Sequence, residues 1–393
     1  MERGIPKISP NKKSFLKKII IVSVTLLFLS FCAKSSNQPF GIATRHHIAT
    51  DIGMNILVEG GNAIDAAVAV SFALAVVNPS AGNLGGGGFM LIHLSETNET
   101  IALDYRERAP IKSFEKMFLD QNEKVIKGLS LNSTLASGVP GTVSGMFYAS
   151  KKFGSVNIEK LISPSIEIAR NGFNLSKFQA KNLNKYKDKF SKNIEAKQIF
   201  TRPNGFKEGD LLIQKNLADT LERISKNGEQ EFYSGETAKM ISEFFKENNG
   251  ILSLEDLRQY KLRVLDPICK NYRTLKICSM PPPSSGGIAL IQMLNILENE
   301  EINTLSHNSE EYLKLLVSVM DFVYRDRAEY LGDPDFYNIP QQLLTSKDYA
   351  KKIFNKIQKG EKPPKIKVTI SESEETTHFS IIDKWGNAVS NTY

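Results

Sequence analysis

The spacing of apolar residues predicts two helices near the start of the sequence. Apolar residues recur at helical intervals within residues 48–59. Residues 63–77 are rich in Ala and Val and apolar on most faces, a pattern typical of a buried helix. Gly60 and Gly61 break the chain between the two segments, and Asn62 supplies a side chain that can cap the second helix. The sequence therefore predicts a helix, a short break and then a buried helix.

Strand-like patterns occupy two other places. Residues 89–94 and 101–105 are predicted to form paired strands joined by a turn around residues 96–98. Residues 268–280 return to the same alternation of apolar and polar positions, with a turn at residues 270–274. These segments predict sheet structure beside the helices.

Helical patterns fill most of the remaining sequence. Residues 114–265 are rich in Lys and Glu and are predicted to be helical with several loops. Within them, residues 159–169 and 217–226 are the clearest amphipathic segments. Two more helices are predicted over residues 284–298 and 311–330. The sequence therefore contains both helical and strand-like segments.

Composition places the chain among globular proteins. Its 393 residues are 41% hydrophobic and 24% charged, which suffices for one large domain or two ordinary ones. The formal net charge is +7, but residues 1–31 carry six Lys and Arg against Glu2 and so contribute +5 of it. Only +2 belongs to the rest, so the charge does not favour a nucleic-acid partner.

The first 31 residues have the layout of an export signal. Basic residues precede an apolar run of 13 residues, Ile19–Phe31, and a membrane-spanning helix needs about 20. We therefore interpret residues 1–31 as a signal peptide of an exported protein. Cys32 follows Leu29-Ser30-Phe31, which resembles a lipoprotein cleavage box. The protein is then periplasmic, or anchored to the membrane by lipid on Cys32; the simpler alternative is a plain signal peptide beside a chance cysteine.

Cys269 and Cys278 flank the predicted turn at residues 270–274. In an exported protein they can oxidise to a cross-strand disulfide. The alternative is a pair of free cysteines in the core. Their spacing does not indicate a metal site.

The strongest candidate for chemistry is a threonine pair near the end of the sequence. Residues 359–375 are rich in Lys, Glu, Pro and Ser, which predicts a mobile linker. Thr376 and Thr377 follow and lead into a strand-like segment. Cleavage between Glu375 and Thr376 would give one residue that holds both a hydroxyl nucleophile and an α-amine to accept its proton. This pattern predicts a self-cleaving threonine enzyme.

Three other features admit a chemical and a structural interpretation. The glycine run Gly85–Gly88 lacks the residues of a phosphate loop, so we expect close backbone approach instead. Arg106 ends a predicted strand and can grip a substrate carboxylate, although an arginine between acids is more often a solvated ion pair. His378 shares a strand face with Thr376, but an α-amine base makes it unnecessary and we favour a structural role. No Gly-x-Ser-x-Gly motif supports a Ser-His-Asp hydrolase.

These segments together resemble the γ-glutamyltranspeptidase, or glutathione hydrolase, family. They occur in the order that the family shows, from about residue 41 to the last residue. The matching segments are residues 60–67, 78–80, 85–90, 104–107, 137–143, 280–287, 326–334 and 376–380.

The resemblance implies an α+β fold of the Ntn-hydrolase type, a four-layer αββα sandwich. It implies a precursor that cuts itself before Thr376, with residues 41–375 as the large-subunit region and residues 376–393 as the start of the small subunit. Thr376 would be the nucleophile and Arg106 the ligand for the substrate α-carboxylate. The substrates would be glutathione and other γ-glutamyl compounds, with water, an amino acid or a peptide as acceptor and no cofactor or metal.

The sequence stops soon after the threonine pair, which departs from the family pattern. The family has further substrate-binding residues beyond the position of Thr392 and Tyr393. We therefore expect a fold that is incomplete at the C-terminus, and a 393-residue chain that is inactive alone. Two alternatives are a glutaryl-type acylase of the same family and a non-catalytic envelope lipoprotein or decayed fragment.

Overall fold

The computed structural model describes residues 39–365 and 376–393. Residues on both sides of this gap belong to one unit, Phe40–Tyr393. The predicted signal peptide, Cys32 and Glu375 lie outside the described residues, and so does most of the predicted linker.

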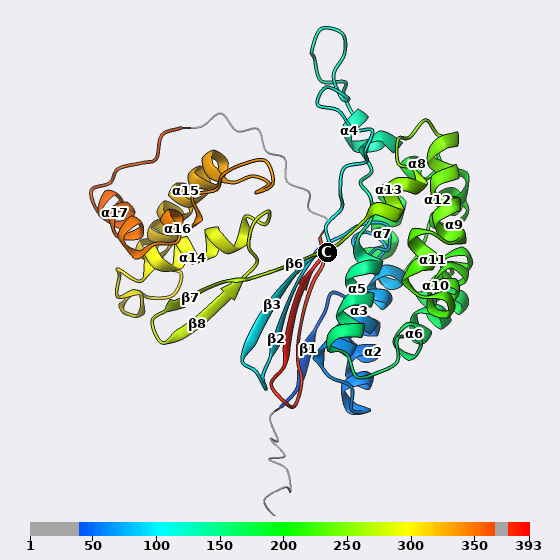
Figure 1. Cartoon of the computed structure of the whole chain (residues 1–393), viewed down its shortest axis with the longest axis horizontal. Coiled ribbons are helices and arrows are strands. Elements are labelled where there is room, and N and C mark those ends of the chain that lie inside the picture. The colour runs from blue at the N-terminus through cyan, green and yellow to red at the C-terminus, as the bar shows by residue number, and fades with distance from the viewer. Residues whose placement is uncertain (1–38, 366–375) are drawn as a thin grey trace, which may run out of the picture. The chain divides into compact units, whose positions relative to one another are not determined.

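A six-stranded antiparallel sheet lies at the centre of this unit (Figure 1). Two adjacent strands, β9 (His378–Ile382) and β10 (Ala388–Thr392), come from the last residues of the sequence, although the strands on either side of them come from the first half. The predicted pair of strands at residues 89–94 and 101–105 is confirmed, and its second strand begins two residues earlier, at Glu99. In spatial order the strands are β1 (Gly41–Ala43), β9 (His378–Ile382), β10 (Ala388–Thr392), β2 (Phe89–Leu94), β3 (Glu99–Asp104) and β6 (Arg263–Leu265).

Helix α3 (Ala63–Val77) is the buried helix that the sequence predicts. Every one of its residues is buried, and it packs against α2 (His47–Val58) and the inner face of the sheet. Asn62 caps it as predicted, accepting from the backbone N–H of Asp65, whose carboxylate accepts from the N–H of Asn62 in return. This reciprocal cap gives the apolar helix a defined start inside the core.

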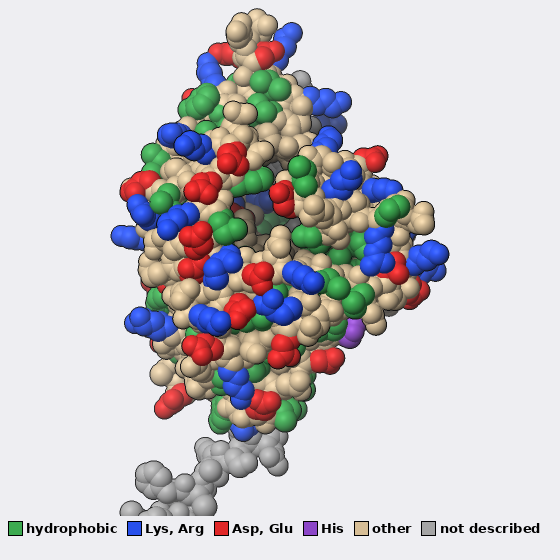
Figure 2. All heavy atoms as spheres, turned by 90° about the vertical axis from the view of Figure 1, so that its right-hand side faces the viewer, with side chains coloured by type: hydrophobic (Ala, Val, Ile, Leu, Met, Phe, Trp, Pro, Cys, Tyr) green, Lys and Arg blue, Asp and Glu red, His purple; other side chains and the backbone are tan. Residues whose placement is uncertain are grey.

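A layer of helices covers the side of the sheet against which α3 packs, and Figure 1 shows α2, α3 and α5 beside the strands. The amphipathic segments 159–169 and 217–226 are confirmed as parts of α6 and α10, which pack against each other. Figure 2 shows acidic and basic side chains interspersed on the outer surface of this side. The helices of this layer are α5 (Thr142–Phe153), α6 (Ile158–Asn171), α7 (Lys177–Lys185), α8 (Lys187–Phe190), α9 (Ile194–Phe200), α10 (Lys215–Asn227), α11 (Glu229–Tyr233), α12 (Glu236–Glu247) and α13 (Leu254–Gln259), with the short strands β4 (Phe173–Asn174) and β5 (Leu211–Leu212) between them.

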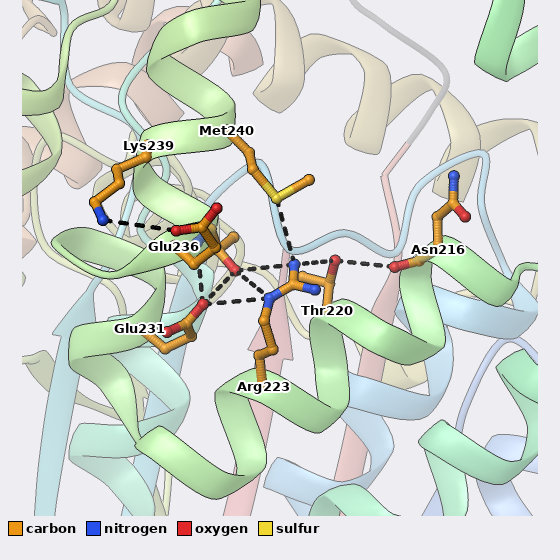
Figure 3. A network of polar contacts seen from close by, with 8 residues as sticks. Asn216, Thr220, Arg223, Glu231, Glu236, Lys239 and Met240 are labelled. Atoms are coloured by element: carbon orange, nitrogen blue, oxygen red, sulfur yellow. Dashed lines mark hydrogen bonds and ion pairs between the residues drawn. The ribbon is translucent and has the colours of Figure 1, made fainter.

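A buried carboxylate joins three of these helices (Figure 3). Glu231 of α11 is 6% exposed and accepts hydrogen bonds from the backbone N–H and the hydroxyl of Thr237. Arg223 of α10 lies 3.3 Å from the same carboxylate. These hydrogen bonds outweigh burial and hold the pKa of Glu231 below its usual value, so the group stays charged at neutral pH.

The segment after β6 forms a hairpin and helices with small hydrophobic clusters of their own. The predicted strand pattern at 268–280 and the helices at 284–298 and 311–330 are confirmed here. The elements are β7 (Ile268–Tyr272), β8 (Leu275–Ser279), α14 (Gly286–Leu297), η2 (Ile302–Thr304), α15 (Glu310–Tyr330), α16 (Gln341–Leu344) and α17 (Lys347–Gln358).

The expectation of a helical middle region is wrong for its first part. Residues 114–128 form turns with one isolated bridge between Leu119 and Val125, and only α4 (Leu129–Asn132) and η1 (Thr134–Ala136) follow before α5. Gly128 adopts a left-handed conformation at φ +82°, and Glu123 does the same at φ +61°. Such positions interrupt a helix, because left-handed residues cannot continue its hydrogen bonding.

Candidate active site

Thr376 lies two residues before strand β9. The backbone N–H and carbonyl of Thr377 exchange hydrogen bonds with Tyr393, both at 3.1 Å, so the pairing of β9 with β10 extends to the threonine pair. Thr377 is 1% exposed on the inner face, whereas Thr376 and His378 are exposed on the other face. The predicted alternation is therefore confirmed, and the hydroxyl-bearing residue at 376 lies on the face that the helices do not cover.

Arg106 lies just beyond the end of strand β3. Its guanidinium lies over the ring of Phe89, with 5.4 Å from the guanidinium carbon to the ring centroid. Its carbonyl accepts a hydrogen bond of 2.9 Å from the hydroxyl of Tyr260. Within residues 39–365 and 376–393, no carboxylate forms an ion pair with Arg106, because the neighbouring Asp104 pairs with Arg263 instead. The side chain is exposed and can bind an anion.

The order of the strands brings these two residues to the same end of the sheet. His378 pairs with Thr392, Thr392 with Phe89, and Phe89 with Asp104, so one row of paired residues crosses four strands. Thr376 lies two residues before this row, just ahead of β9, and Arg106 lies two residues after it, just beyond β3. Three strand spacings separate their backbones by roughly 14–15 Å, and the Arg106 side chain over Phe89 narrows that gap.

The glycine run passes between these strand ends and a neighbouring helix. The carbonyl of Gly86 accepts from the N–H of Gly141 at 2.7 Å and of Thr142 at 3.1 Å, at the start of α5. A side chain at Gly87 would collide with the carbonyl of Tyr105, and one at Gly88 with Tyr393. The expectation of close backbone approach is confirmed, and the run holds the Arg106 segment against the end of β10.

His378 is engaged by its neighbours on the exposed face. Its Nδ1 lies 2.7 Å from the Thr392 hydroxyl and its Nε2 lies 3.2 Å from the Ser380 hydroxyl. Partial burial lowers the pKa of His378, so the ring is neutral at neutral pH. Both ring nitrogens thus have partners within the sheet.

Sequence analysis did not identify the polar residues on the buried, inner face of the sheet. Asn391 of β10 is fully buried, and its Oδ1 accepts a hydrogen bond of 2.5 Å from the hydroxyl of Tyr105. Asp383, at the end of β9, accepts from the backbone N–H of Ala63 at the start of α3. The alternation along β10 could have predicted that Asn391 is buried, because Asn391 lies between Val389 and Tyr393, whose side chains also face the core.

The remaining candidate residues lie elsewhere. Cys269 and Cys278 face each other on β7 and β8 and are joined by a disulfide. The described residues contain no group of three or more His, Cys, Asp or Glu side chains that could hold a metal ion. Among the helices described, none has the length and apolar character to cross a membrane.

Comparison with known proteins identifies the family of this chain. The family model for gamma-glutamyltranspeptidase matches residues 49–393. The glutathione hydrolase proenzyme of Escherichia coli (strain K12) is 45% identical over 359 residues, which cover 90% of this chain and 62% of that protein. The glutathione hydrolase proenzyme of Pseudomonas sp. (strain A14) is 43% identical, over 98% of this chain and 68% of that protein. The chain thus spans about two thirds of the length of these relatives.

A solved structure shows the same fold. The crystal structure of Helicobacter pylori gamma-glutamyltranspeptidase aligns with a TM-score of 0.80 at 43% identity. The alignment covers 86% of this chain and 99% of that one.

Proposed function

The chain belongs to the gamma-glutamyltranspeptidase family, and we propose that it is part of a self-cleaving precursor that transfers γ-glutamyl groups to water or an amino acid. The observation that carries this proposal is the convergence of Thr376 and Arg106 at one end of the sheet. The names of the relatives, glutathione hydrolase proenzymes, support glutathione as a substrate and processing of a precursor.

Cleavage between Glu375 and Thr376 creates the catalytic group. The freed α-amine of Thr376 takes the proton from its own hydroxyl, which attacks the γ-carbonyl of the substrate. The acyl–enzyme ester forms as the amine leaving group departs with a proton. Water or an acceptor amine then breaks the ester and releases glutamate or a new γ-glutamyl compound.

Arg106 holds the substrate by its α-carboxylate. The guanidinium is exposed and has no carboxylate partner among the described residues, so it can form a two-pronged contact. Its stacking on Phe89 directs it across the sheet toward β10 and the nucleophile. This contact selects substrates with a free carboxylate at the far end from the reacting carbonyl.

The small subunit would begin at Thr376 and stay inserted in the sheet, since β9 and β10 pair with β1 and β2 of the large-subunit region 41–375. We further propose that residues 1–31 direct export, to the periplasm or to a lipid anchor on Cys32. Mass spectrometry of the mature N-terminus tests this: an N-terminus that still contains residues 1–31 would contradict it.

The experiment uses the whole precursor that contains this sequence. We expect Thr376→Ala to abolish both the cut after Glu375 and the release of glutamate from glutathione. We expect Arg106→Ala to raise KM roughly 10- to 100-fold, because it removes the charge-assisted contact with the substrate α-carboxylate. Arg170→Ala is the matched control, because Arg170 forms only surface ion pairs with Asp219 and Glu222.

Three outcomes would overturn this assignment. A Thr376→Ala precursor that is still cut at the same bond contradicts self-cleavage. Turnover of a glutaryl amide, which lacks the α-amine, in preference to a γ-glutamyl amide favours the glutaryl-type acylase. An unprocessed protein with lipid on Cys32 favours the non-catalytic lipoprotein.

A further inference from the structure

Tyr105 links the substrate-binding segment to the protein core. It directly precedes Arg106, is fully buried, and exchanges backbone hydrogen bonds with Gly88 at 3.0 and 3.3 Å. Its ring lies so close to α5 that a Cβ added at Gly145 would lie 2.5 Å from the ring Cγ. The ring therefore has little freedom to move, and its hydroxyl has a fixed position.

Asn391 accepts the hydrogen bond from that hydroxyl and lies on strand β10, next to β9. The Tyr105 hydroxyl donates to Asn391 Oδ1 at 2.5 Å across a sequence separation of 286 residues. Asn391 pairs with Phe379 of β9 on one side and with Met90 of β2 on the other. A shift of Asn391 would thus move β10 against both β9, which follows Thr376, and β2, which follows the glycine run.

We propose that Asn391 is a positioning residue, which acts through the hydroxyl of Tyr105 to fix Arg106 at the distance from Thr376 that a γ-glutamyl substrate requires. The inference rests on the proposed function of Arg106 and Thr376. The buried face of the sheet would then contribute to substrate recognition on the exposed face.

The polar atoms around this hydrogen bond argue against a role in stability alone. The Nδ2 of Asn391 and the hydroxyl of Thr377 are both buried and have no hydrogen-bond partner among the described residues. Buried polar groups without partners cost folding free energy, and an apolar pair would fill the same space without that cost. Burial also raises the pKa of Tyr105, so its hydroxyl remains a neutral donor.

The test separates substrate positioning from stability. The precursor and its Tyr105→Phe, Asn391→Leu and double variants are assayed with γ-glutamyl-p-nitroanilide and with 4-aminobutyryl-p-nitroanilide, which lacks the α-carboxylate. We expect KM for the γ-glutamyl compound to rise about 5- to 10-fold in all three variants, with kcat within about twofold. KM for the compound without the carboxylate is expected to stay unchanged. The double variant should match the single ones, because all three remove one hydrogen bond.

Tyr393→Phe is the matched control. Tyr393 lies on the same buried face, but its hydroxyl donates to the carbonyl of Ser71 in α3 and not to the Arg106 segment. This variant should lower the melting temperature and leave both KM values unchanged. The double variant Tyr105→Phe/Asn391→Leu should keep its melting temperature, because it removes donor and acceptor together.

The outcomes distinguish this inference from the proposed function. If Arg106→Ala raises KM and the Tyr105 and Asn391 variants do not, the positioning role is wrong and the function stands. If the variants change KM equally for both substrates, or if Tyr393→Phe has the same effect, the cluster is only structural. If Arg106→Ala itself leaves KM unchanged, the proposed function is wrong and the positioning role is wrong with it. Tyr105→Phe removes a single oxygen, so it keeps the test valid if Asn391→Leu does not fold.

Discussion

Two hairpins of equal strand length are held in place by different means. β9–β10 and β7–β8 each pair two strands of five residues. β9–β10 lies inside the six-stranded sheet, flanked by β1 and β2, and buries Phe379, Ile381 and Val389. β7–β8 forms a two-stranded sheet of its own, buries only Ile268 among its strand residues, and carries the disulfide. Paired strands and buried side chains hold β9–β10, whereas β7–β8 combines packing against α14 with a disulfide.

This difference matters because one hairpin is expected to survive a cut in the chain. If the bond before Thr376 breaks, β9–β10 loses its covalent connection to the large-subunit region. Its paired neighbours and buried side chains then have to retain it, along with the carboxylate of Asp383. An isolated two-stranded hairpin is at best marginally stable, so β7–β8 needs its disulfide and its packing against α14.

The largest expected effect comes from truncating a core side chain of β9. Phe379 is fully buried between the sheet and α3, so Phe379→Ala should lower the free energy of unfolding by about 3–5 kcal/mol. Leu275→Ala in β8 is the control, since Leu275 is 60% exposed and should cost less than about 0.5 kcal/mol. Denaturant unfolding measures the free energy of unfolding of both variants. Equal losses would contradict the difference between the two hairpins.

The second effect tests the covalent bond in β7–β8. Replacing Cys269 and Cys278 by Ser should cost roughly 2.5 kcal/mol of local stability, as a short loop is no longer closed in the unfolded state. Hydrogen exchange should speed up in β7 and β8 and stay unchanged in β9 and β10. Faster exchange in both hairpins would show that they do not open independently.

The third effect removes a charge that holds β9–β10 to helix α3. Asp383 is 1% exposed and accepts from the backbone N–H groups of Ala63, Trp385 and Asn387, each at 2.9 Å. Asp383→Asn replaces one acceptor oxygen by a donor and should cost about 2 kcal/mol. The cut precursor should show the effect more strongly than the uncut one, and size-exclusion chromatography measures it as dissociation of the fragment that begins at Thr376. No difference between cut and uncut forms would contradict this role.

The smallest effect is a pH dependence that His378 gives to β9–β10. Burial lowers the pKa of His378 in the folded state, so the unfolded chain binds its proton more readily. The stability from this group is fully present above its unfolded pKa of about 6.5 and is lost as pH falls through the lower folded value. Hairpin β7–β8 contains no His within residues 268–279. The difference in melting temperature between wild type and His378→Gln should therefore narrow or reverse at acidic pH. A difference that stays constant with pH would contradict the pH dependence attributed to His378.

Local patterns predicted the elements that depend on neighbouring residues. The Ala and Val run at 63–77 is a buried helix because it is apolar on every face, and Asn62 caps it through residues only two and three positions away. The region 114–128 defied the same reasoning. Its charged residues suit a helix, but turns and left-handed residues interrupt it.

The sequence by itself indicated the family of this protein, which the comparisons confirm, and it predicted Thr376 as the nucleophile and Arg106 as the substrate ligand. These are short motifs whose meaning lies in the order of a few adjacent residues. Only the tertiary structure decided how the two are held together. The Tyr105–Asn391 hydrogen bond and the Asp383–Ala63 hydrogen bond join residues 286 and 320 positions apart. Such contacts leave no periodic signal in either segment, because the partners become neighbours only when the sheet places β10 and β9 between β1 and β2.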